Sequence, residues 1–131
     1  MNGVDHTPRV LVVEDEAIIA LDIEQTLKRA DFDVVACLSV QAALDEIDAH
    51  AFDCAVVDLN LQGVLARDVV KALERRGIRF IVVSGCEKSA VSASRCRTHF
   101  LEKPFDRAKL LRAVAETTGW GGSRRVIQIR S

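Results

Sequence analysis

The feature that most constrains the fold of this chain is an alternation between short β-branched runs and longer segments with helical periodicity. The runs predict five strands, at Arg9–Val13, Asp33–Cys37, Phe52–Val57, Ile78–Val83 and His99–Glu102. The longer segments predict helices at Glu16–Ala30, Val40–Ala49, Leu65–Arg76 and Asp106–Thr118. Strands that alternate with helices of this length pair in parallel through right-handed crossovers. We therefore predict an α/β protein, a three-layer sandwich with helices on both faces of a five-stranded parallel sheet.

Length and composition restrict the class of protein. The chain has 131 residues, of which 49% are hydrophobic and 28% are charged, so it has the size of one domain. This balance excludes a disordered chain, a collagen-like repeat and a coiled coil. No apolar run is long enough to span a membrane, and the first residues lack the apolar stretch of a secretory signal. We therefore expect a soluble cytoplasmic protein.

The cysteines and the net charge argue against two further kinds of site. The four cysteines form no C-x-x-C pair and have no histidine at a spacing that suits zinc. They are Cys37, Cys54, Cys86 and Cys96, and we expect them to be reduced, structural thiols. The net charge of −1 argues against a nucleic-acid binder of the wholly basic kind.

Polar residues stand at the ends of four of the five predicted strands. The first strand ends in Glu14-Asp15-Glu16, the third in Asp58 and the fourth in Ser84, while the fifth leads into Lys103. Each has an ordinary explanation, because acids favour helix N-termini, aspartate forms turns, serine caps helices and lysine is solvated. The carboxyl ends of parallel strands share one edge of the sheet, where ligands bind in such folds. The joint occurrence of these residues at that edge therefore indicates a site.

The residue types at this edge suit phosphoryl transfer. Carboxylates from two strands repel one another and need a cation, and a site with few protein oxygen ligands suits Mg²⁺. A lysine and a hydroxyl on the other side suit a group with negative oxygens. Together they predict a carboxylate that accepts a phosphoryl group while a metal and a lysine neutralise charge in the transition state.

In their order along the chain, these residues resemble the receiver domain of two-component response regulators. The matching motifs are Val10-Leu-Val-Val-Glu-Asp-Glu16, Val57-Asp-Leu-Asn60, Val83-Ser-Gly85 and Lys103-Pro-Phe105. The resemblance covers Arg9 to Thr118 and implies a flavodoxin-like fold with strand order 2-1-3-4-5 and about five helices. It leaves residues 1–8 as a flexible head and residues 119–131 as a C-terminal tail.

The resemblance also implies a metal site. Asp15 takes the place of the direct ligand to Mg²⁺, and Glu14 takes that of the second acid, which acts through water. Asp58 and the backbone carbonyl of Asn60 would complete the contacts between the protein and the metal.

The other matched positions concern the phosphoryl group itself. Asp58 matches the phosphoacceptor, Lys103 the lysine that pairs with the phosphoryl oxygens, and Ser84 the switch hydroxyl. Phe100 takes the place of the switch aromatic, which is more often tyrosine in the family. The bond between Lys103 and Pro104 is cis in this family.

The function implied by the resemblance is that of a stand-alone receiver, a signalling switch rather than an enzyme. A histidine kinase or a histidine phosphotransfer protein would phosphorylate Asp58, and the altered surface would change binding to an unidentified output protein. We expect no direct contact with DNA or membrane, and the sequence leaves the oligomeric state open. A phosphate shuttle or sink and a phosphorylation-independent adaptor are the alternatives. An aspartyl phosphatase of the haloacid-dehalogenase type is disfavoured, because Asn60 stands where those enzymes carry a second aspartate.

Two segments carry further predictions. Residues 86–98 contain three serines and a threonine, whose side chains compete with helical hydrogen bonding. We predict that this stretch, shorter than in the usual receiver, holds a short helix that is partly disordered until Asp58 is phosphorylated. The tail starts rich in glycine and continues into a β-prone run among arginines. It is either a frayed terminus or a strand that adds to a partner.

Overall fold

The structure is a computed structural model that describes residues 7–61, 64–85 and 96–120, with the backbone alone at positions 60, 61, 64 and 65. The secondary-structure elements of the described residues have the following bounds: β1 Arg9–Val13, α1 Ala17–Arg29, β2 Asp33–Cys37, α2 Val40–Ala49, β3 Cys54–Asp58, β4 Asn60–Leu61, β5 Val64–Leu65, α3 Arg67–Arg76, β6 Phe80–Ser84, β7 Arg97–Glu102 and α4 Arg107–Thr118. None of the helices in this part of the chain has the length and apolar character that crossing a membrane requires.

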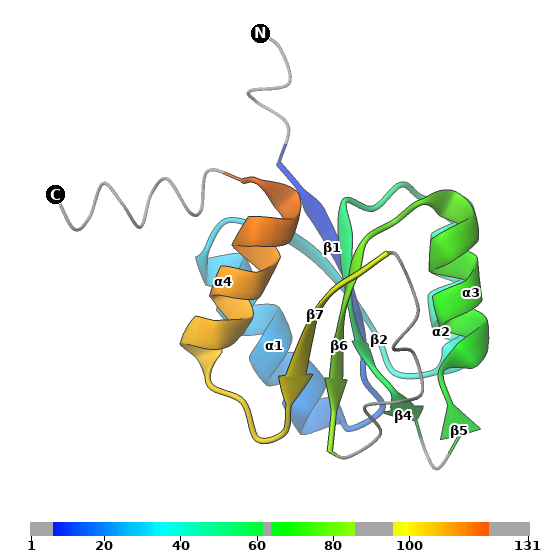
Figure 1. Cartoon of the computed structure of the whole chain (residues 1–131), viewed down its shortest axis with the longest axis horizontal. Helices are drawn as coiled ribbons and strands as arrows, with labels where there is room; N and C mark the ends of the chain where they lie inside the picture. The colour runs from blue at the N-terminus through cyan, green and yellow to red at the C-terminus, as the bar shows by residue number, and fades with distance from the viewer. Residues whose placement is uncertain (1–6, 62–63, 86–95, 121–131) are drawn as a thin grey trace, which may run out of the picture.

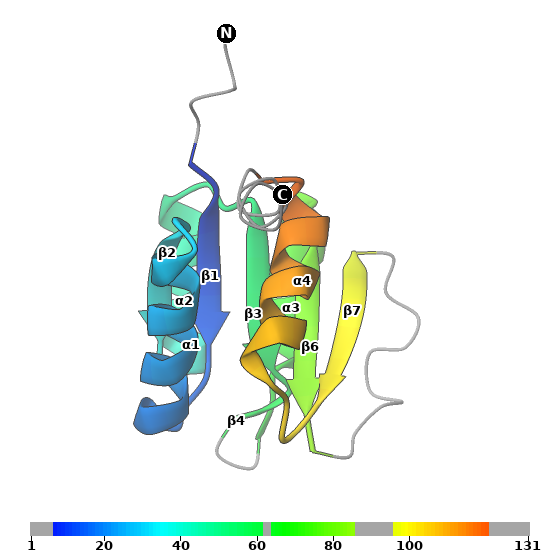
Figure 2. The same ribbon diagram turned by 90° about the vertical axis from the view of Figure 1, so that its left-hand side faces the viewer.

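Five of the strands form one parallel sheet in the order β2-β1-β3-β6-β7. Helices α1 and α4 cover one face of the sheet, and α2 and α3 cover the other (Figures 1 and 2). This arrangement confirms the predicted flavodoxin-like sandwich with strand order 2-1-3-4-5. The described residues contain four helices rather than about five. The fifth was predicted between Ser84 and Phe100, and positions 86–95 of that stretch lie outside the described residues.

Two apolar clusters fill the space between the sheet and the helices. Successive side chains of a strand point to opposite faces, so Val10 and Val12 pack beneath α1 and α4, whereas Leu11 and Val13 pack beneath α2 and α3. Strands β3 and β6 are buried at every residue. Helices on both faces are the reason why these runs lack a clean alternation of apolar and polar residues in the sequence.

A short antiparallel hairpin, which the sequence did not predict, follows β3. Asn60–Leu61 pairs with Val64–Leu65, and the N–H of Ala66 donates to the carbonyl of Leu59 at 2.9 Å. Helix α3 consequently begins at Arg67, two residues later than predicted. Strands of two residues are too short for an alternation of apolar and polar residues to predict them.

Strand β7 also differs from its prediction. It begins at Arg97, two residues earlier than expected, and its register against β6 shifts between Phe80 and Ile81. The sequence predicts a short, partly disordered helix over residues 86–98. For residues 97 and 98 this prediction is wrong, because they belong to β7.

Local signals at the helix ends and in the core agree with the sequence. The Ser39 hydroxyl oxygen accepts the N–H of Ala42 at 3.1 Å and so caps α2. Gly77 ends α3 with φ +68°, a left-handed conformation that favours glycine. Cys37 and Cys54 are buried free thiols, as predicted. Burial raises the pKa of Cys54 to about 12, so this thiol is not reactive. Cys86 lies outside the described residues.

Candidate functional site

Three carboxylates meet where β1 and β3 end. Glu14 and Asp15 follow β1 directly, and Asp58 is the last residue of β3. The two strands are neighbours, with Val13 paired to Val57, so the turn after β1 faces the end of β3. One oxygen from each of the three carboxylates lies within 4.8 Å of the others. The predicted convergence of these side chains is therefore present in the fold.

Burial distinguishes this cluster from an ordinary acidic surface. Glu14 and Asp58 are buried, with 1% and 4% of their surface exposed, and Asp15 is half-buried. The backbone N–H of Glu16 donates to the Glu14 carboxylate at 3.1 Å. Burial raises the pKa of Glu14 to about 7; this N–H bond opposes the rise, while the neighbouring Asp58 carboxylate adds to it. At neutral pH and without a cation, the cluster therefore carries unfavourable negative charge.

Lys103 supplies the positive charge of the site. Its ammonium donates to Asp58 Oδ2 at 3.2 Å and to Glu14 Oε1 at 3.3 Å. Burial disfavours the charged ammonium, but the carboxylates of Asp58 and Glu14 outweigh this effect and raise the pKa of Lys103. The backbone places the side chain here, because the Lys103 N–H donates to the Ser84 carbonyl at 2.9 Å. The bond from Lys103 to Pro104 is cis, as the resemblance to receiver domains implies.

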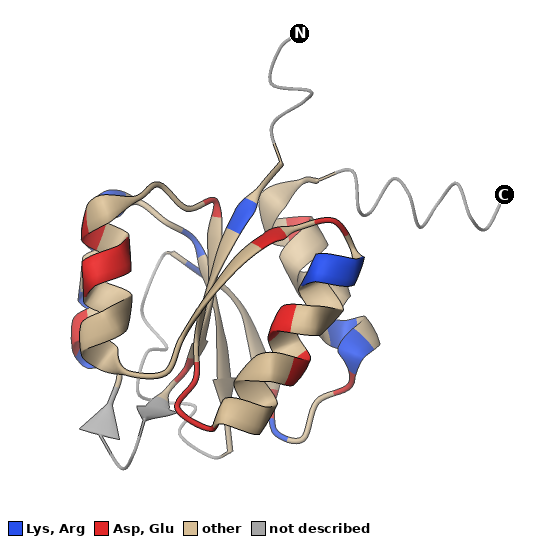
Figure 3. Ribbon diagram, turned by 180° about the vertical axis from the view of Figure 1, so that it is seen from behind, with Lys and Arg blue, Asp and Glu red and all other residues tan. Residues whose placement is uncertain are grey.

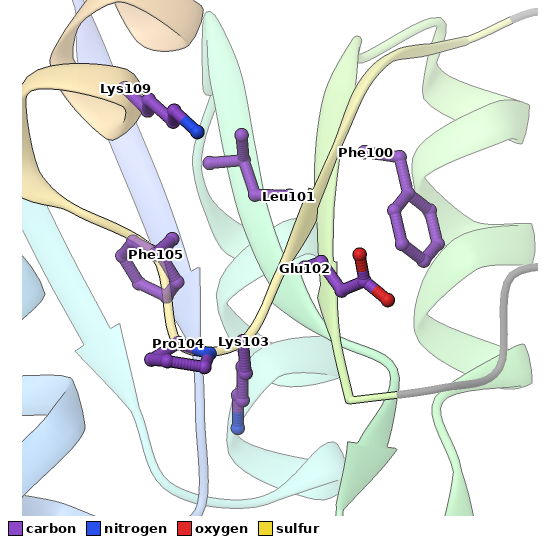
Figure 4. A pocket seen from close by; sticks show the side chains of 7 residues that line it. All are labelled: Phe100, Leu101, Glu102, Lys103, Pro104, Phe105 and Lys109. Atoms are coloured by element: carbon purple, nitrogen blue, oxygen red, sulfur yellow. The ribbon is translucent and has the colours of Figure 1, made fainter.

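The other predicted site residues are Ser84, Asn60 and Phe100, and each lies on a different element of the fold. Ser84 is fully buried at the end of β6 and is tied to Lys103 through its carbonyl. Asn60 opens the hairpin two residues after Asp58, and its side chain is not among those described. Phe100 lies in β7, half-buried against the apolar cluster beneath α2 and α3. In Figure 4 its ring lies apart from the ammonium of Lys103, on the other side of β7 from Leu101. The structure thus brings Glu14, Asp15, Asp58 and Lys103 together and leaves Phe100 apart from them.

A groove of about 500 Å³ lies beside the cluster, along β7 and the turn that follows it. Its lining, drawn in Figure 4, consists of Phe100, Leu101, Glu102, Lys103, Pro104, Phe105 and Lys109. Lys103 lines this groove, and its ammonium also contacts the carboxylates of Glu14 and Asp58.

The donor set of the cluster matches a hard divalent cation. Three carboxylates that offer oxygens within 4.8 Å of one another face one ammonium, which leaves an excess of negative charge. Oxygen ligands from few protein residues are what Mg²⁺ takes, since it keeps several waters. Among the residues that the structure describes, no histidine or cysteine contributes to this group, which disfavours the metals that prefer nitrogen or sulfur.

Comparison with known proteins decides the family. Residues 10–115 match the response regulator receiver domain. The chain belongs to that family. This receiver domain is 28% identical over 108 residues to the transcriptional activator protein PfeR of Pseudomonas aeruginosa, an alignment that covers 79% of the chain but 35% of PfeR. The chain spans between 16% and 54% of the other curated relatives that match.

Solved structures agree on the fold. A CheY-like receiver domain protein of Methanospirillum hungatei JF-1 superposes with a TM-score of 0.79 at 23% identity, covering 92% of this receiver domain and 99% of that chain. The receiver domain of a sensor histidine kinase from Pseudomonas aeruginosa PAO1 superposes with a TM-score of 0.74 at 20% identity, covering 87% and 99%. That second structure was solved with a magnesium ion coordinated in its active-site cleft.

One contributor to the site was not predicted from the sequence. The N–H of Glu16 holds the Glu14 carboxylate in place, although Glu16 itself is exposed. The signal was present, because an acid two residues before the first turn of a helix can accept from the free N–H groups there. The run Glu14-Asp15-Glu16 predicts acids that favour a helix N-terminus or bind a metal, but it does not specify which N–H pairs with which carboxylate.

Proposed function

We propose that this receiver domain is a phosphoacceptor switch, in which Asp58 takes a phosphoryl group from a histidine kinase or a histidine phosphotransfer protein. The observation that carries the proposal is the pairing of the buried Asp58 carboxylate with the Lys103 ammonium, 3.2 Å apart. A buried carboxylate with a cationic partner and two more carboxylates beside it is suited to become an acyl phosphate.

The transfer needs little covalent chemistry from the protein. A carboxylate oxygen of Asp58 attacks phosphorus, the bond from phosphorus to the donor's histidine nitrogen breaks, and that nitrogen keeps the electron pair. Lys103 compensates the charge on the phosphoryl oxygens, for which it is already placed beside Asp58. Ser84 would donate its hydroxyl to the same group, and Phe100 would follow the movement of β7. Since the chain would mainly modify itself, we describe it as a signalling switch and not as an enzyme.

Mg²⁺ is the proposed cofactor. Asp15, Asp58 and the backbone carbonyl of Asn60 would hold the ion, with Glu14 acting through a bound water. When bound, the ion would neutralise the carboxylates and the incoming phosphoryl oxygens. The magnesium ion in the receiver domain of the Pseudomonas aeruginosa kinase supports this assignment by analogy.

The surface around the site supports a protein as the phosphodonor. Ile18 is 84% exposed and Leu21 is 50% exposed, one turn apart on α1. Both lie just after Asp15, so an apolar surface that approaches Asp58 from this side would cover them. We propose that the donor acts in the cytoplasm and that an unidentified output protein responds to the phosphorylated form.

A direct test uses acetyl phosphate as the small phosphodonor. Incubation of the full chain with acetyl phosphate and Mg²⁺ should add one phosphoryl group, detected by intact mass spectrometry. Asp58→Asn, which keeps the shape of the side chain, should abolish the addition, whereas Asp48→Asn, an exposed position on α2, should leave it unchanged. A normal yield from Asp58→Asn would overturn the assignment.

A further inference from the structure

The outer edge of β2 is open within the described part of the chain. The N–H of Asp33 donates to Pro8, and the carbonyl of Cys37 accepts from Glu14, so the odd-numbered residues of β2 face β1. Because the polar groups of a strand alternate in direction, the N–H and C=O groups of Val34 and Ala36 point away from the sheet. Natural edges are often protected by lysine, proline or a bulge, and β2 has no such residue. The edge is therefore able to accept another strand.

The side chains at this edge are also incompletely covered. Val35 packs against the cluster beneath α2 and α3, and Ala36 against the cluster beneath α1 and α4, and both are only half-buried. Leu38, directly after the strand, is 47% exposed. An added strand would remove apolar surface from water on both faces of the sheet.

The surroundings of β2 are acidic. Figure 3, in which β2 lies nearest the viewer, shows acidic segments on the two helices that flank it, α1 and α2. Asp31 and Asp33 lie at the start of the strand. Burial raises the pKa of Cys37 to about 11, and the charges of Glu46 and Asp45 contribute to this rise, so both carboxylates lie near the end of the strand. Acids thus border β2 at both ends.

The C-terminal tail has the complementary chemistry. Residues 124–130 read Arg-Arg-Val-Ile-Gln-Ile-Arg, and residues 121–131 contain three arginines and no acid. Valine and isoleucine favour extended backbone. Two arginines precede the apolar residues and one follows them, which matches the acids at the start and at the end of β2.

The topology of the sheet favours the β2 edge for a strand that follows α4. The crossover through α1 runs from β1 to β2, and α4 covers the same face as α1. A right-handed crossover through α4 must therefore continue in the same direction, toward β2. All inner places of the sheet are taken, and addition beside β7 would make the crossover left-handed. The place outside β2 is the one that satisfies the rule.

The length of the tail also fits this placement. Helix α4 ends at the edge of the sheet where β1 and β2 begin (Figure 1), and it packs against β3, β6 and β7. From above β3 to a place outside β2 are three strand spacings, or about 14 Å, and the helix layer lies about 10 Å above the sheet, so the straight path is about 17 Å. The six steps from Trp120 to Val126 reach about 20 Å when extended. A strand that starts at Val126 is therefore within reach of its own chain.

We propose that the C-terminal tail of this chain adds to the outer edge of β2 as a sixth parallel strand, with Val126–Arg130 alongside Asp33–Cys37. In this register Arg130 lies near Asp45 and Glu46, while the arginine pair before Val126 lies near Asp33. This addition gives hydrogen-bond partners to the outward-facing backbone groups of Val34 and Ala36.

 The outward N–H groups of Val34 and Ala36 then donate to carbonyls of the tail.

Amide hydrogen exchange on the full chain, resolved by residue with NMR, tests this placement. The double variant Ile127→Pro/Gln128→Pro blocks pairing in either register, because one of two neighbouring amides must face β2. We expect the amides of Val34 and Ala36 to exchange at least about tenfold faster in this variant than in the unchanged chain. The amides of Val35 and Cys37, which face β1, should keep their rates, and Ser131→Pro serves as the matched control with no effect.

Two results would overturn the proposal. One is equal exchange of Val34 and Ala36 in the unchanged chain and in the double proline variant. The other is a dimer, seen by sedimentation, that disappears in the double proline variant, because the tail would then pair with a second copy and not with its own β2.

Discussion

The two ends of the parallel sheet carry the same kinds of charged residue in different surroundings. At the amino end, Arg9 Nε lies 3.0 Å from Asp33 Oδ2, with side chains that are 39% and 50% exposed. At the carboxyl end, Lys103 Nζ lies 3.2 Å from Asp58 Oδ2, with side chains that are 25% and 5% exposed. The distances are nearly equal, so distance alone does not distinguish the exposed ion pair from the buried one.

Burial makes the difference between the two ends. Water screens the Arg9–Asp33 pair, and such pairs contribute about 0–1 kcal/mol to the free energy of unfolding. At the other end Glu14 joins the pair while 1% of its side chain is exposed, and its pKa rises to about 7 because it is buried. The buried carboxylates at this end are not fully neutralised by Lys103, so they can bind a cation, and the Lys103 ammonium can bind an anionic group.

The largest expected effect comes from removing the cation at each end. Lys103→Met keeps the alkyl stem and leaves Asp58 and Glu14 buried without their partner, so we expect the free energy of unfolding without metal to fall by about 3 kcal/mol. Arg9→Met, the matched change at the exposed end, should cost less than about 1 kcal/mol. Urea unfolding in the presence of a chelator measures both. Equal losses would show that burial does not distinguish the two pairs.

The pH dependence of stability should come from the buried end. Because the pKa of Glu14 is about 7 in the folded protein and 4.5 for an ordinary glutamate, the folded state binds the proton more tightly. Protonation of Glu14 therefore stabilises the fold, and stability is lost as pH rises between these values. We expect the metal-free protein to lose about 2 kcal/mol from this group between pH 5 and pH 8. Glu14→Gln should flatten the profile, and a profile with the unchanged slope in that variant would contradict the assignment.

Magnesium should act at the carboxyl end alone. At ten to a hundred times its Kd the ion should raise the free energy of unfolding by about 1–3 kcal/mol. Asp15→Asn should abolish this gain, whereas Asp33→Asn at the amino end should preserve it. Thermal unfolding with and without millimolar Mg²⁺ measures the difference. A melting temperature that Mg²⁺ leaves unchanged in the natural sequence would count against the metal site.

The smallest effect concerns salt. Asp33→Asn should change the free energy of unfolding by about 0.5 kcal/mol at low ionic strength, and this change should vanish in 0.5 M NaCl because exposed charges are screened. The cost of Lys103→Met should be nearly the same at both salt concentrations, because buried charges are screened much less. Urea titrations at two salt concentrations give the comparison.

The fold was predictable because its signals are local. The buried strands β1, β3 and β6 are nearly continuous apolar runs, and the polar residue at the end of each is found by counting, as with Asp58 at the end of β3. The alternation of strands and helices then places these residues at one edge without knowledge of any side-chain conformation. The strand order itself came from the resemblance to receiver domains and not from the pattern.

What was missed depends on contacts that no local pattern records. The hairpin of β4 and β5 rests on two residue pairs, and the early start of β7 depends on its pairing with β6. The bridging position of Lys103 between Asp58 and Glu14 is set by side-chain conformations in the folded protein. Sequence spacing brings the residues to one edge, but only packing decides which atoms touch.

The residue after Asp58 has a consequence for how a signal leaves the site. Leu59 donates its N–H to Val83 at 3.0 Å, accepts the N–H of Ala66 at 2.9 Å and is fully buried. The backbone at the neighbouring Asp58 is therefore held firmly in place. We expect that a group added to Asp58 would displace Lys103 and the adjoining end of β7 rather than the end of β3.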